Sequence, residues 1–142
     1  MEDAITKRGD SAIADADLLT KLERSIPFLA DLTHADVLLY YPGSQPNTAV
    51  VVAHGQPHTV SSAYPESLLG KQVGKRNEPA LFEVLNGSEP ASGQPCLMIP
   101  GPRSIQEWYP VRGEGGQVCA ALCIESNRLE FDRKRKKNYH FR

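Results

Sequence analysis

Residues 36–55, DVLLYYPGSQPNTAVVVAHG, decide the fold. Residues 37–41 are apolar and aromatic, and Pro42 and Gly43 close the run, which predicts a short buried strand. Residues 48–54 form a second apolar run, rich in valine. Because only a short polar segment separates the two runs, the sequence predicts an antiparallel hairpin.

A helix is expected before this hairpin, over residues 15–33. Its leucine and isoleucine residues recur at helical spacing and predict one buried face. The members of this face are Leu18, Leu19, Leu22, Ile26, Leu29 and Leu32. Pro27 interrupts the pattern, so we expect a kinked helix or two abutting helices. Residues 1–14 are polar and are expected to form a flexible N-terminus.

Residues 55–77, which follow the hairpin, form a long connection. Connections of this length in a compact domain usually have a function. Asn77 is then expected to cap a short helix over residues 78–85. Pro79 lies in the first turn of this helix and Gly87 follows its end, the asymmetry typical of a short helix.

Two more strands are predicted, over residues 104–111 and 117–124. The second strand is apolar on both faces, so it should be central in a sheet covered on both sides. Residues 15–127 therefore predict an α+β domain, with a central antiparallel sheet of about five strands. The N-terminal helix and the short helix flank this sheet, and we expect both on one side of it.

Composition limits the class of protein. The chain has 142 residues, which is enough for one hydrophobic core. Its net charge is −1, so it lacks the positive balance of a nucleic-acid-binding protein. Residues 128–142 carry seven Lys and Arg against Glu130 and Asp132, which indicates a basic linker or a truncated signalling helix. The three cysteines are an odd number, and no apolar run reaches the roughly 20 residues of a membrane span. We therefore expect a cytoplasmic protein with no membrane contact.

Four pieces of the chain carry a resemblance to a known family. They are residues 30–40 (ADLTHADVLLY), residues 63–70 (AYPESLLG), Glu78-Pro79 at the start of the short helix, and residues 109–112 (YPVR). Their order and spacing resemble the GAF-like N-terminal sensor domain of cytoplasmic two-component histidine kinases. The resemblance implies a GAF/PAS-like fold, followed in the same polypeptide by a PAS domain, a dimerising phosphoacceptor helix pair and an ATP-binding domain. Some of these kinases pair with response regulators that are RNA-binding antiterminators.

No catalytic motif is present. The sequence has neither the GxSxG of a nucleophile elbow nor a P-loop, so we expect no catalytic residues, no cofactor and no enzyme activity in the domain itself. His54 and His58 are four residues apart, but Gly55 and Pro57 lie between them, so they are not expected to share a helix face or bind metal.

Cys119 and Cys123 are four residues apart on a predicted strand. They should point to the same face, roughly 13 Å apart at about 3.3 Å per residue, which is too far for a disulfide. We expect them to be small core residues.

The family resemblance implies a ligand pocket between one sheet face and the long connection. Its candidate residues are His54, Tyr64, Arg76, Trp108 and Cys119. An aromatic floor with a few polar groups suits a small cytosolic molecule. The N-terminal helix offers a second surface, through which two copies could form a homodimer.

Two other functions stay open. One is a ligand-free interaction or dimerisation domain with a collapsed pocket. The other is a small thiol-dependent enzyme that uses Cys96, Cys119 or Cys123.

Overall fold

The computed structural model describes residues 2–60, 62–88, 94–95 and 104–127. The elements are α1 (Glu2–Thr33), β1 (Asp36–Pro42), β2 (Thr48–Gly55), β3 (Gln72–Gly74), α2 (Pro79–Leu85), β4 (Gln94–Pro95), β5 (Ser104–Arg112) and β6 (Val118–Asn127). Within the described ranges the strands form one six-stranded antiparallel sheet in the order β3-β2-β1-β6-β5-β4. The predicted α+β class is confirmed, and the short β3 and β4 add to the strands that the sequence predicted.

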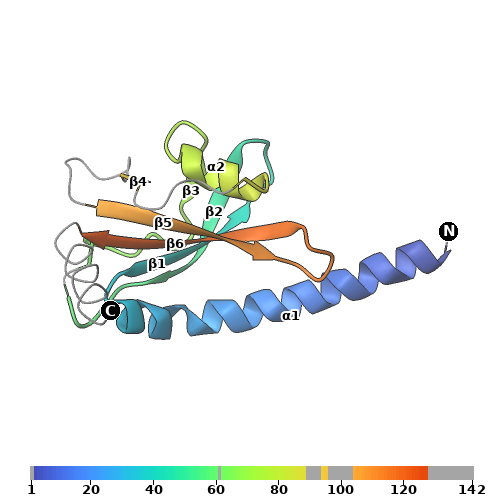
Figure 1. Cartoon of the computed structure of the whole chain (residues 1–142), viewed down its shortest axis with the longest axis horizontal. Helices are drawn as coiled ribbons and strands as arrows, with labels where there is room; N and C mark the ends of the chain where they lie inside the picture. Colours follow the sequence, from blue (N-terminus) through green and yellow to red (C-terminus); the bar gives the residue numbers. More distant parts are fainter. Residues whose placement is uncertain (1, 61, 89–93, 96–103, 128–142) are drawn as a thin grey trace, which may run out of the picture.

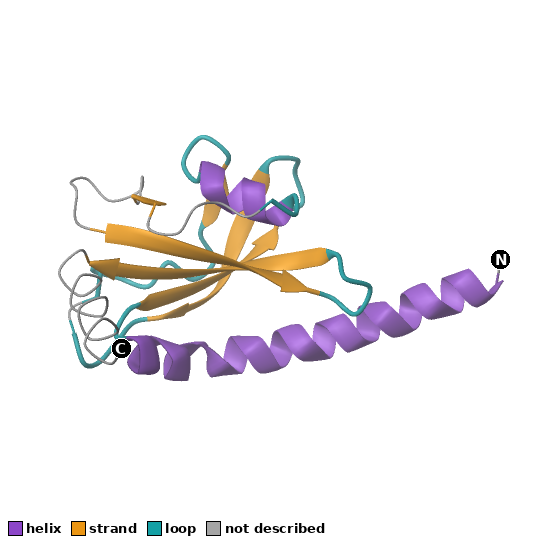
Figure 2. Ribbon diagram, viewed as in Figure 1, coloured by secondary structure: helices purple, strands orange, loops and turns teal. Residues whose placement is uncertain are grey.

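The two helices cover opposite faces of the sheet (Figures 1 and 2). α1 packs on a core cluster centred on Val37 and Leu39, whereas α2 packs on a separate cluster that includes Leu38 and Tyr40. Alternate residues of β1 therefore enter different cores, as the period of two in a strand requires. The expectation that both helices lie on one side was wrong, because residues 37–41 of β1 are all apolar or aromatic and so do not distinguish the two faces.

β1 and β2 form the predicted hairpin. Their pairing runs from Val37 opposite Gly55 to Pro42 opposite Ala49, with a register shift after Leu39. Gly43 N–H donates to the carbonyl of Thr48 at 2.8 Å and closes the turn. β6 lies between β1 and β5, so its predicted central position is also confirmed.

α1 is longer than the sequence predicted. It is one helix from Glu2 to Thr33 with Pro27 inside it. It therefore begins before the expected residue 15, and of the two alternatives expected at Pro27 it excludes two abutting helices. His34, at a left-handed φ of 54°, ends the helix, and Ala35 N–H donates to the carbonyl of Ala30 at 3.2 Å. This is the hydrogen bond of a Schellman motif, here with histidine where glycine is usual.

Only part of the predicted apolar face of α1 packs on the sheet. Ile26 and Ala30 are fully buried, and Leu19, Leu22 and Leu29 pack beside them. Two other members of the predicted face, Leu18 and Leu32, remain 43% and 62% exposed. The predicted buried face of α1 was therefore too wide, since a helix that packs on a sheet buries only a narrow stripe of its side chains.

Asp15 holds α1 to the far end of the sheet. Its Oδ1 accepts a hydrogen bond of 2.9 Å from the N–H of Glu114, in the turn between β5 and β6. Beyond Asp15, toward Glu2, the helix continues past this turn (Figure 1).

α2 begins at Pro79, with Glu78 as the preceding cap residue and no side-chain cap hydrogen bond, so the predicted Asn77 cap was wrong. Gly87, at a φ of 91°, follows the helix end as expected. Ala80, Leu81, Phe82 and Val84 are its buried residues. The expected apolar run at residues 96–99, and the basic tail at 128–142, lie outside the described residues.

Candidate functional site

Three neighbouring strands each place one polar side chain in a single row on the α2 side of the sheet. Asp36 of β1 is opposite Glu125 of β6, and Glu125 is opposite Gln106 of β5. Residues directly opposite one another project from the same sheet face. Asp36 and Glu125 are 1% exposed and Gln106 is 2% exposed. The sheet therefore carries a polar row, Asp36–Glu125–Gln106, inside the domain.

Glu78, the residue before α2, adds a third carboxyl group, above this row. It is 1% exposed. The side-chain amide of Gln106 is 3.1 Å from Glu78 Oε2 and 3.0 Å from Glu125 Oε1. One amide group thus donates to two buried carboxyl groups, one from a strand and one from the start of a helix.

Two aromatic residues orient this cluster. Trp108 Nε1 donates to Gln106 Oε1 at 3.2 Å, which turns the amide NH₂ of Gln106 toward the carboxyl groups. The hydroxyl of Tyr64, from the long connection, is 2.8 Å from both oxygens of Glu125. We call Glu78, Gln106, Glu125, Tyr64 and Trp108 the carboxyl cluster.

Burial sets the electrostatics of the cluster. It raises the pKa of Glu78 to about 7, because a charged carboxylate is poorly solvated there. Hydrogen bonding from Gln106 works in the opposite direction, and the nearby charge of Glu125 raises the Glu78 pKa further. Glu78 is therefore a carboxyl group that changes its charge near neutral pH.

At the other end of the polar row, Asp36 binds His54 and Ser62. Asp36 Oδ2 is 2.7 Å from His54 Nε2 and 2.6 Å from Ser62 Oγ. His54 Nδ1 accepts a hydrogen bond of 2.9 Å from the N–H of Leu68, so Nε2 carries the proton that is donated to Asp36.

This Ser-His-Asp set is not arranged for catalysis. The Ser62 hydroxyl donates to the aspartate, whereas a nucleophilic serine needs a histidine nitrogen that can take its proton. Both nitrogens of His54 are already engaged, and its side chain is fully buried. The set instead fastens the long connection to the sheet, since Ala63 N–H also donates to Asp36 Oδ1, at 2.7 Å.

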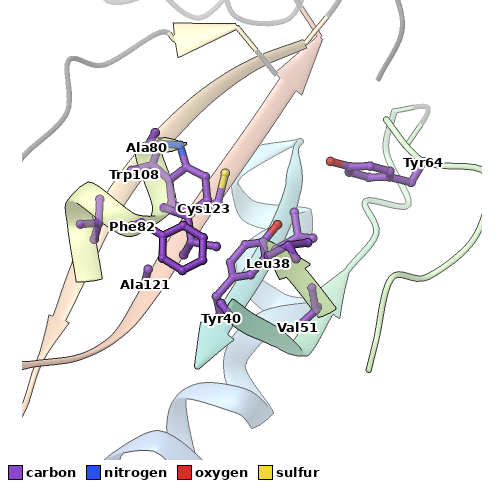
Figure 3. Packing of buried hydrophobic residues seen from close by; sticks show 13 residues of the cluster. Leu38, Tyr40, Val51, Tyr64, Ala80, Phe82, Trp108, Ala121 and Cys123 are labelled. Carbon is purple, nitrogen blue, oxygen red and sulfur yellow. The ribbon is translucent and has the colours of Figure 1, made fainter. Parts of the chain in front are cut away.

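The rest of this sheet face is filled by apolar and aromatic side chains (Figure 3). Tyr40 and Trp108 have ring centroids 5.5 Å apart, and His54 and Tyr64 meet edge to face at 5.4 Å. The buried members of this cluster are Leu38, Tyr40, Ala49, Val51, Tyr64, Val73, Ala80, Leu81, Phe82, Val84, Trp108, Ala121 and Cys123.

Three of the five predicted pocket residues lie on this face. They are His54, Tyr64 and Trp108, and each is hydrogen-bonded to a member of the polar row. Tyr64 and Trp108 also belong to the core cluster beside it. Arg76 is exposed in the turn after β3 and is not brought to them.

Cys119 is on the other side of the sheet. The register of β5 and β6 shifts between Val111 and Arg112, and Val118 pairs with Arg112 while Ala120 pairs with Val111. This bulge leaves Cys119 beside Asp15 of α1, whose charge raises the Cys119 pKa, and beside Tyr41, whose pKa Cys119 helps to raise. The prediction that Cys119 and Cys123 share a face was therefore wrong, because a bulge adds one residue and reverses the alternation.

Cys119 lacks the features of a reactive thiol. Burial raises its pKa, and the charge of Asp15 raises it further. Cys123 is fully buried, and Cys96 lies outside the described residues. In the described part of the chain, no three His, Cys, Asp or Glu side chains are grouped to hold a metal ion. Nor, over the same residues, is any helix long and apolar enough to cross a membrane.

Sequence reasoning did not find Asp36, Glu78, Gln106 or Glu125. Asp36 immediately precedes an apolar strand, and Glu125 stands two residues after Cys123 in another, so strand alternation would have placed both on a buried face. No local sequence pattern links them to Glu78, because Glu78 meets the polar row only when α2 packs on the sheet.

Solved structures share this architecture. One described as the sensor region of a sensor histidine kinase is 25% identical, with a TM-score of 0.56; the match covers 82% of this chain and 41% of that one. The chain thus spans less than half of that structure. HmgR from Pseudomonas aeruginosa, at 19% identity and a TM-score of 0.52, matches over 85% of this chain and 62% of its own, and shows the fold alone. No curated protein sequence matches the chain.

The family comparison is more specific. The family described as the GAF domain of the histidine kinase PdtaS matches residues 1–141, which is nearly the whole chain. The fold, the order of its elements and the histidine kinase sensor region among the similar structures agree with this match. They confirm the resemblance that the sequence indicated, and the chain belongs to the GAF domain family of the histidine kinase PdtaS.

Proposed function

We propose that this GAF domain is a non-catalytic, cytoplasmic input module that works as a homodimer, through the exposed side of α1, and passes its state to PAS and kinase domains of the same polypeptide. The observation that carries the proposal is an apolar stripe on α1 that faces away from the sheet. Phe28 is 66% exposed, Leu32 is 62% exposed and Leu18 is 43% exposed.

The spacing of this stripe suits a helix–helix contact. Leu18, Ser25 and Leu32 are seven residues apart, and Phe28 follows Ser25 by three, which is the a/d spacing of a coiled-coil seam. We call Leu18, Ser25, Phe28 and Leu32 the outer stripe. It lies beside the buried stripe of Leu22 and Ile26, so a second α1 could pack there without displacing the sheet.

The length of α1 also supports a dimer. A helix of 32 residues is about 48 Å long at 1.5 Å per residue. A stable interface needs roughly 800 Å² from each partner, which a short helical turn cannot supply but a long helix pair can. Residues 2–14, which continue past the β5–β6 turn, would lengthen this contact (Figure 1).

A small-molecule ligand on the α2 side of the sheet stays a prediction. Polar side chains that converge within an apolar, aromatic surface are typical of a ligand site, and the carboxyl cluster has this character. The filled packing around Tyr40 and Phe82 favours the ligand-free alternative. The raised pKa of Cys119 argues against the thiol-enzyme alternative.

The dimer is tested by replacing Phe28 and Leu32 with glutamate. Each copy would lose two apolar contacts worth about 1–2 kcal/mol, so the dimer should weaken on the order of 100-fold or more. Sedimentation equilibrium should therefore show a dimer for the natural chain and a monomer for F28E/L32E, with circular dichroism unchanged.

Leu69 provides the matched control. It is 64% exposed, close to the 66% of Phe28, but lies in the long connection rather than on α1. L69E should leave the dimer intact. A natural chain that stays monomeric at high concentration, or an L69E variant that dissociates as F28E/L32E does, would contradict the proposal.

A further inference from the structure

The carboxyl cluster joins α2 to the sheet through two acidic groups and one amide. Glu78 and Glu125 are each 1% exposed, and both accept from the same NH₂ group of Gln106. Two carboxylates so close in a poorly solvated site repel each other strongly when both are charged. Such pairs hold one proton between them until the pH is well above the usual carboxyl range.

We propose that Glu78 and Glu125 share a proton in the folded domain, and that loss of this proton as the pH rises releases Glu78 and the start of α2 from the sheet. This inference goes beyond the proposed input role and does not depend on the dimer. It makes the attachment of α2 a proton-sensitive contact inside the domain.

Glu78 is the group that should move. Its carboxyl oxygens accept hydrogen bonds from the Gln106 amide, and Glu78 stands at the end of the connection that leads into α2. Glu125 is held more firmly, in the central strand β6 and by the hydroxyl of Tyr64. Burial and the charge of Glu125 raise the pKa of Glu78 to about 7, which agrees with release near neutrality.

Other titratable groups lie near the cluster, and their titration must be distinguished from that of Glu78. Cys123 Sγ, on β6, is 3.9 Å from Glu125 Oε1. Asp36, on β1, is the next member of the polar row and is hydrogen-bonded to His54, Ser62 and Ala63. His54 already accepts the N–H of Leu68 at Nδ1. On α2 itself, Glu83 is exposed.

The sign of the effect on stability follows from the raised pKa. A folded-state pKa of about 7, above the ordinary value of 4.5, means that the folded chain holds more protons than the unfolded chain between these two values. Stability therefore falls as the pH rises from 4.5 through 7 and levels off above that range. If Glu78 moves into water, the charged carboxylate is solvated and less stability is lost. The domain then loses the contact between Glu78 and Gln106 that holds the start of α2 to the sheet.

Trp108 is a built-in reporter, because it is the one tryptophan of the chain and its indole N–H donates to Gln106. Its emission should change in a single-proton step centred between about pH 6 and 8 when the natural chain is titrated from about pH 5 to 9. Glu78→Gln keeps the shape and removes the charge, so its titration should be flat in that range. Glu83→Gln should titrate as the natural chain does.

Carboxyl-selective carbon NMR of the natural chain gives a second reading that needs no variant. One glutamate carboxyl should titrate above pH 6, and the amides at the start of α2 should shift with it. A flat Trp108 titration in the natural chain, a step that survives in E78Q, or the absence of any glutamate titrating above pH 6 would each overturn the proposal. None of these measurements depends on the oligomeric state, so a failed dimer would leave them interpretable.

Discussion

Gly55, at the end of β2, is a residue where α1 and the sheet come into close contact. A Cβ atom at this position would lie 2.6 Å from the carbonyl oxygen of Ile26 and 3.0 Å from Cβ of Ala30. Both neighbours belong to α1 and are fully buried. Glycine is thus required here for space, and this one residue sets the distance between the helix and the hairpin.

The substitution Gly55→Ala should push α1 away from β2. Overpacking of this kind costs about 1–3 kcal/mol, so the urea midpoint of the chain should fall clearly. Gly74→Ala is the control, because the nearest atom to its added Cβ is 4.0 Å away, and it should be neutral or slightly stabilising. Equal midpoints for the two variants would contradict this account of the helix–sheet contact.

At the scale of elements, the long connection after β2 is fastened to the sheet by one carboxylate. Asp36 accepts from His54, Ser62 and the N–H of Ala63, and the connection is held again where Tyr64 reaches Glu125. The sequence indicated a functional connection of unusual length. It gave no sign of these anchors, because they come from residues 18 to 61 positions apart in the chain.

Asp36→Asn tests this anchoring. The amide replaces one acceptor oxygen with a donor, so at least one of the three hydrogen bonds to a charged group is lost, at a cost of about 2 kcal/mol. Hydrogen exchange at Ala63 and Tyr64 should speed up by roughly 30-fold, while exchange in β6 stays slow. Asp31→Asn, at an exposed aspartate bound to His58, should leave those amides unchanged. Equal protection in both variants would show that Asp36 does not hold the connection.

The elements themselves were largely predictable, and their surroundings were not. Local signals placed the β1–β2 hairpin, the start of α2 near Pro79 and the central strand β6, since turn residues and apolar periodicity act over a few positions. The opposite faces of the two helices, the bulge at Cys119 and the meeting of Glu78 with Glu125 depend on packing between distant segments. His54, Tyr64 and Trp108 were identified by type, but the acidic groups they accompany were not.

For the whole molecule, the two sides of the sheet have different tasks. The α2 side encloses the carboxyl cluster and the aromatic core, and a change there would alter how α2 sits on the sheet. The α1 side carries a long helix that is half packed on the sheet and half exposed. β1 and β6 belong to both cores, so they physically connect the two sides.

The outer stripe of α1 is the centre of this account, and cross-linking at Ser25 tests it most directly. Ser25 is exposed and lies midway between Leu18 and Leu32, so two copies that meet along the stripe in parallel bring their Ser25 residues together. Under mild oxidation, Ser25→Cys should form a disulfide-linked dimer much faster than the natural chain or Glu66→Cys, which places a thiol in the exposed connection. A Ser25→Cys chain that cross-links no faster than these two controls would contradict the proposed dimer.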